Sequence, residues 1–212
     1  MRVEWRRDLR TRDRGLMWRV ALLFMVGSFC FALGSFPLYA QNVDPGTVGM
    51  TFFVGSIFFT SASAGQLLQT RRDGGGRLLL RSAQVQLLGT LFFNLSTWDA
   101  MRDSLDIEQT NRLVWAPDLF GSIAFLVASH LAWLAVCHRL WCVRRDDVDW
   151  WIAAINYVGS IWFMLSAIGS VTLTTTGQEL NTTIVNSGTF LGAVCFLVGA
   201  YLLLPARSRQ TA

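Results

Sequence analysis

Apolar stretches recur six times along the chain, and short polar or charged segments separate them. Because an apolar helix needs about 20 residues to cross a bilayer, each stretch predicts one transmembrane helix. The predicted spans are 16–39, 48–68, 78–98, 115–137, 151–173 and 182–204. The third is the most polar, since Arg81, Gln84 and Gln86 lie in its first turns. The pattern predicts an all-α, polytopic membrane protein with a transmembrane domain over 16–204.

Each predicted helix contains the same short pattern: Gly, then Ser, Thr or Ala, then two residues, then Phe. The glycines are Gly27, Gly55, Gly89, Gly121, Gly159 and Gly192. A further small residue follows seven positions after each glycine, so every helix has a small–Phe–small stripe on one face. In lipid, small residues let helices approach closely. We therefore interpret the glycines as helix-packing residues rather than as hinges or phosphate-binding loops.

The segments "VGSIFFTSAS", "FGSIAFLVAS" and "VGSIWFMLSA" begin at 54, 120 and 158 and carry this pattern in tandem. They resemble the YrhK-like bacterial membrane domain family, whose unit is a pair of helices. The resemblance implies three helical hairpins, at about 16–68, 78–137 and 151–204. It implies no activity and no catalytic residues.

The arginines are distributed unevenly, and they supply all 18 basic side chains. With both termini cytoplasmic, 16 arginines lie inside and only Arg102 and Arg112 lie outside, which is a strong positive-inside pattern. The Arg-rich segment 1–15 and the tail 205–212 are then cytoplasmic. Arginine without lysine suggests a GC-rich bacterial source, so we expect a multi-pass protein of the cytoplasmic membrane. Anionic lipid headgroups are the expected partner, and no nucleic-acid role is needed to explain the charge.

The overall composition agrees with this class. Hydrophobic residues make up 52% of the chain and charged residues 15%, against about 25% charged residues in soluble domains. The four cysteines have no spacing that suggests a disulfide framework, and we expect free, buried thiols. They are Cys30, Cys137, Cys142 and Cys195.

Polar residues inside the spans are the candidates for chemistry, because an ionisable group in a bilayer is costly. Asp118 follows Pro117 at the outer start of the fourth helix, where it can cap the helix or form an outward-facing cation or proton site. His130 lies near mid-membrane, where it can be a hydrogen-bonded packing residue or a proton relay. Asn94 can join two helices or line a polar path.

Cofactor and enzyme sites find no support in the sequence. His130 and His138 lie on one helix about 12 Å apart, so they cannot ligate one haem between them. The segment "CHRLWC" (137–142) matches no zinc signature. There is no HExxH motif, no Ser–His–Asp arrangement and no pair of carboxylates at catalytic spacing. We expect no catalytic residue, no metal and no cofactor.

Two functional hypotheses remain ahead of an intramembrane enzyme. The first is a structural, accessory or lipid-associated membrane component, which can bind a protein partner or form a homo-oligomer. The alternative is a small ion- or proton-coupled transporter or channel that uses Asp118 and His130. A transporter of this kind predicts that both residues face a shared polar cavity.

Overall fold

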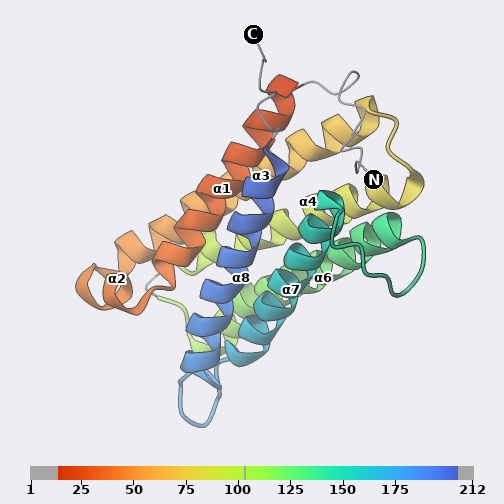
Figure 1. Cartoon of the computed structure of the whole chain (residues 1–212). Helices are drawn as coiled ribbons and strands as arrows, with labels where there is room; N and C mark the ends of the chain where they lie inside the picture. Colours follow the sequence, from red (N-terminus) through yellow and green to blue (C-terminus); the bar gives the residue numbers. More distant parts are fainter. Residues whose placement is uncertain (1–13, 103, 205–212) are drawn as a thin grey trace.

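The computed structural model describes residues 14–102 and 104–204, and these residues are mostly helical (Figure 1). The helices are α1 (Arg14–Gly34), α2 (Pro37–Asn42), α3 (Pro45–Arg72), α4 (Arg77–Asp99), α5 (Ile107–Thr110), the π-helix η1 (Asn111–Trp115), α6 (Ala116–Cys137), α7 (Val148–Gly169) and α8 (Thr182–Leu203). The described residues contain no strand, so the predicted all-α class is confirmed. The predictions for most of 1–15 and for the tail 205–212 lie outside the described residues.

Two helices end at least four residues earlier than predicted, and α3 extends four residues beyond its predicted end, to Arg72. The first helix stops at Gly34 rather than at 39, because Pro37 has no backbone N–H and starts the separate helix α2. The fifth stops at Gly169 rather than at 173. Beyond it, segment 170–181 folds back on itself: Leu173 N donates to Gln178 O at 2.8 Å, and Leu180 N donates to Val171 O at 2.9 Å.

Five segments of the described chain are long and apolar enough to cross a membrane. They are Arg14–Gly34, Pro45–Arg72, Ile107–Cys137, Val148–Gly169 and Thr182–Leu203. Helix α4 is not among them; its first half contains Arg77, Arg81, Gln84 and Gln86. The apolar helices are those of a membrane protein, with five candidate spans.

The six long helices form a closed ring. Consecutive helices pack most extensively as α1 with α3, α4 with α6, and α7 with α8. Further contacts of α3 with α4, α6 with α7, and α8 with α1 close the ring. The turn 73–76 and the loop 138–147 lie at one end of this bundle, and α2 and segment 170–181 lie at the other (Figure 1). Because most described arginines lie near the first of these ends, we call it the arginine-rich end.

The repeated glycines bring the helices of each pair into backbone contact. The pairs are Gly27 with Gly55, Gly89 with Gly121, and Gly159 with Gly192. A Cβ atom on any of the six would lie between 3.0 and 3.2 Å from the carbonyl oxygen of its partner glycine. The contacts are reciprocal, so each pair has an approximate local two-fold axis, and the three pairs repeat around the ring.

The repeated phenylalanines meet at the centre of the ring, where they form what we call the phenylalanine core. Its members are Phe31, Phe59, Phe93, Phe125, Phe163 and Phe196, each at most 7% exposed. Neighbouring ring centroids in this core lie 5.0 to 6.4 Å apart, mostly edge-to-face or tilted. The axis of the bundle is therefore filled with aromatic side chains.

Candidate functional site: a polar cavity at the arginine-rich end

Asp118 lies in the first turn of α6, at the end opposite the arginines. Its carboxyl group lies close to the Ser170 hydroxyl and within electrostatic range of Glu179. Burial raises the pKa of the Glu179 carboxyl above its ordinary value. Asn111 joins η1 to segment 170–181, because its side-chain amide donates to Thr172 O at 2.8 Å and accepts from Thr172 N at 2.9 Å. Asp118 thus belongs to a polar cluster around segment 170–181.

The other two predicted residues lie in helix interfaces. The His130 ring faces Tyr157 of α7 at a centroid distance of 5.8 Å, and its buried Nδ1 atom has no hydrogen-bond partner among the described residues. Asn94 joins α4 to α3. With its amide nitrogen turned towards acceptors, it donates to Ser56 O at 3.0 Å and its oxygen accepts from Thr60 Oγ1 at 2.9 Å. Asp118, His130 and Asn94 are therefore not gathered at one place.

A cavity of about 380 Å³ lies between α3, α4, α6 and α7 at the arginine-rich end. This volume falls within the range typical of small-molecule sites. Its wall includes side-chain amides and hydroxyls, from Gln66, Gln69, Thr70, Ser82, Gln86, Ser129 and Asn156, and the acidic residues Asp73 and Asp149. We call it the amide-lined cavity. Asp118, His130 and Asn94 do not line it.

Several amides of this cavity have unused hydrogen-bonding capacity. Gln69 is 8% exposed, and no hydrogen bond joins its side chain to the described residues. The buried oxygens Gln66 Oε1 and Asn156 Oδ1 also lack a partner there. The two serine hydroxyls differ, since Ser82 Oγ donates to a backbone carbonyl at 2.8 Å and Ser129 Oγ pairs with another serine hydroxyl at 2.7 Å. A buried polar group without a partner costs about 1–3 kcal/mol, so the cavity is suited to a molecule that hydrogen-bonds to amides.

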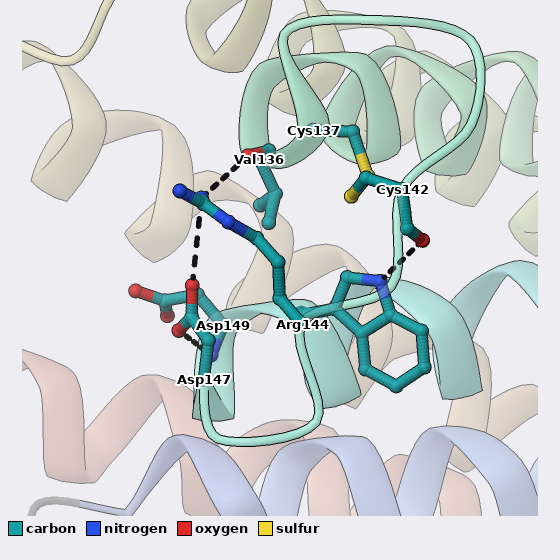
Figure 2. A network of polar contacts seen from close by, with 7 residues as sticks. Val136, Cys137, Cys142, Arg144, Asp147 and Asp149 are labelled. Carbon is teal, nitrogen blue, oxygen red and sulfur yellow. Dashed lines mark hydrogen bonds and ion pairs between the residues drawn. A yellow bond between two sulfur atoms is a disulfide. The ribbon is translucent and has the colours of Figure 1, made fainter. Parts of the chain in front are cut away.

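The loop 138–147, which we call the rim loop, supplies charged residues at the edge of the cavity (Figure 2). Arg144 Nη1 donates to Val136 O at 3.1 Å and lies 3.8 Å from an Asp147 carboxylate oxygen. Asp147 in turn accepts from Asp149 N at 3.0 Å and caps α7. The loop is thereby joined to the ends of both helices that it connects.

A disulfide between Cys137 and Cys142 closes part of the rim loop (Figure 2). The prediction that all four cysteines are free is wrong for this pair, whereas Cys30 and Cys195 are free. The physical reason is the end of α6: His138 adopts a left-handed conformation with φ of 55°, which stops the helix and turns the chain. The two Cα atoms then lie 5.5 Å apart, within the range for a disulfide.

Removing this disulfide should loosen the rim loop. We expect the double variant Cys137→Ser/Cys142→Ser to lose roughly 2 kcal/mol of stability, the chain-entropy contribution of so short a closed loop. Hydrogen–deuterium exchange at the amides of 138–147 should rise accordingly. The matched control is Cys30→Ser/Cys195→Ser, which replaces two half-buried free thiols. Equal exchange in both variants would contradict the expectation.

The sequence predictions missed the residues of the amide-lined cavity. Gln69 lies one residue beyond the predicted end of the second span, Gln86 is one of the polar residues in the first turns of the third span, and Gln66 is not among the predicted candidates. A usable signal was present, because Gln66 and Gln69 are three residues apart and share one helical face. Carboxamides facing inward from two neighbouring spans would have marked the site.

Comparisons of the chain with protein-family models, with curated proteins and with solved structures found no match.

Proposed function

We propose that the chain is a six-span protein of the bacterial cytoplasmic membrane, with three helical hairpins and both termini in the cytoplasm. The sixth span is α4, whose 23 residues extend about 34 Å, enough for a hydrocarbon core of about 30 Å. Its position in the ring between α3 and α6 supports this assignment. The arginine distribution supports the orientation.

Cysteine labelling tests this topology. In a background with the native cysteines replaced by serine, Gly75→Cys would lie at the arginine-rich end and Gln178→Cys at the opposite end. A membrane-impermeant maleimide should label Gln178→Cys in intact cells and Gly75→Cys only after permeabilisation. Labelling of both variants in intact cells would refute the six-span topology, because the turn 73–76 would then face outwards.

The function that we propose is non-enzymatic: an accessory membrane component that binds a small, uncharged polar molecule from the cytoplasmic side. The main support for this binding function is the set of amides in the amide-lined cavity that lack a hydrogen-bond partner. Carboxamides both donate and accept hydrogen bonds, so they suit a neutral ligand with several such groups. The phenylalanine core fills the bundle axis, which favours binding over conduction along that axis.

Thermal stabilisation by neutral solutes tests the binding function. The purified protein would be melted in detergent with nicotinamide, with uridine and with a neutral disaccharide as probes. At least one probe should raise the Tm of the wild type, and Gln69→Leu and Asn156→Leu should each abolish the rise. Gln178→Leu, on the exposed loop at the other end, should keep it. If no probe raises the Tm, or if Gln69→Leu responds like the wild type, the binding function is wrong.

Proton-coupled transport is a second candidate, because the buried His130 Nδ1 lacks a partner among the described residues and Asp118 lies near Glu179. Proton and cation flux into proteoliposomes tests it. Loss of flux in both His130→Ala and Asp118→Asn, with helicity retained, would favour transport. Absence of flux in the wild type would exclude it.

A further inference from the structure

The rim loop exposes three large apolar side chains. Leu140 and Trp141 are each 77% exposed, and Val143 is 59% exposed. No other large hydrophobic side chain of the described residues exceeds 64%. A contiguous exposed apolar patch marks a surface that contacts a membrane or a partner.

Two tryptophan hydrogen bonds and the disulfide fix the backbone of this exposed segment. Trp133 Nε1 donates to Leu140 O at 3.1 Å, and Trp150 Nε1 donates to Cys142 O at 3.1 Å. The disulfide closes the same turn. Trp141 also lies against Trp133, with ring centroids 6.1 Å apart. Because its backbone is fixed in this way, the loop holds the Leu140 and Trp141 side chains on the outside of the molecule.

Basic side chains flank the apolar ones. Arg139 and Arg145 are exposed, and neither guanidinium forms a hydrogen bond or an ion pair with the described residues, whereas Arg144 is bound to Val136 and Asp147. The loop connects α6 and α7, both of which lie in segments apolar enough to span a membrane, so it lies where a bilayer surface would be. Tryptophan is enriched at membrane interfaces, and arginine is attracted to anionic headgroups.

We propose that the rim loop is an interfacial anchor, which inserts Leu140, Trp141 and Val143 among acyl chains while Arg139 and Arg145 bind anionic lipid headgroups. This combination of apolar tip and basic flanks is that of segments that lie in the interface. The inference goes beyond the proposed binding function and does not depend on any ligand of the amide-lined cavity. Since His138, Arg144 and Asp147 line that cavity, the anchor also fixes the cavity edge relative to the membrane surface.

Fluorescence quenching tests the insertion. The protein would be reconstituted into liposomes that contain phosphatidylglycerol brominated near the headgroup end of its acyl chains, and Trp141→Phe would be compared with the wild type. The substitution should remove fluorescence that brominated lipid quenches and aqueous iodide does not. Removal of iodide-quenched fluorescence instead would show that Trp141 stands in water, and the anchor would be refuted in favour of a solvent-exposed or protein-binding loop.

A charge comparison tests the headgroup contact. Brominated phosphatidylglycerol should quench Trp141 at least two-fold more than brominated phosphatidylcholine at the same mole fraction. Arg139→Gln/Arg145→Gln should abolish this preference, and Arg112→Gln, on an exposed arginine at the opposite end, should retain it. Equal quenching by the two lipids in the wild type would overturn the anionic-lipid assignment.

Discussion

Replacing Gly192 by leucine should cost the bundle about 3 kcal/mol of unfolding free energy or more, at the upper end of the range for overpacked cores. A Cβ atom alone at this position would lie 2.5 Å from Phe163 Cδ1 and 3.0 Å from Gly159 O. The second of these neighbours is backbone and cannot move without separating α7 from α8. Leucine adds three further carbons in the same direction, so the damage should exceed that of Gly192→Ala.

Unfolding by sodium dodecyl sulfate in lipid–detergent micelles, followed by circular dichroism, measures this loss. The control is Gly76→Ala, since a Cβ atom at Gly76 has no neighbour within 4 Å. Stability should decrease in the order Gly76→Ala, Gly192→Ala, Gly192→Leu. If Gly192→Leu matches the control, close backbone packing is not what the repeated glycine provides.

Truncating Phe59 to alanine should destabilise the bundle by about 2–3 kcal/mol. The side chain is 1% exposed and contacts Phe31, Phe125 and Phe196 of the phenylalanine core. Phe→Ala substitutions in soluble cores cost about 3–5 kcal/mol, part of which is transfer into water on unfolding. In a membrane the unfolded side chain remains in lipid, so mainly the packing and cavity contributions are lost.

The matched control for this prediction is Phe29→Ala, which truncates a phenylalanine that is 57% exposed on the outside of α1. Its unfolding free energy in the same micelles should change by less than about 0.5 kcal/mol. Equal losses at Phe29 and Phe59 would contradict a specific role for the phenylalanine core.

The sequence was informative wherever a pattern was local to one helix. The Gly–Phe repeat identified the face of each helix that is buried, because positions four and seven residues apart share a face. It could not identify the partner of that face. Whether the helices pack side by side or around an axis depends on contacts such as that of α8 with α1, which join residues far apart in the chain.

The candidate site was harder to predict because it is shared among helices. Gln69 and Asn156 lie on α3 and α7, and only the closed ring places both on one cavity. The disulfide was missed for a different reason. In a continuous helix Cys137 and Cys142 would not face each other, and the left-handed turn at His138 that brings them together leaves no mark in composition.

The disulfide and the arginine-rich loops lie at the same end of the molecule. Disulfides persist mainly in oxidising compartments, whereas the proposed topology places this end in the cytoplasm. A cytoplasmic disulfide would be exposed to cellular reductants. The cysteine labelling described above therefore also decides in which redox environment the Cys137–Cys142 pair resides.

The three equivalent helix pairs allow the chain to begin at more than one place in the ring. Each pair repeats the same glycine contact, and Leu16 near the start of α1 packs against the same core as Leu203 at the end of α8. The order of the pairs along the chain is therefore not required by their packing. A circular permutant that begins at α4 or α7, with α8 linked to α1, would present the same ring, and so would three separate hairpins assembled as a trimer.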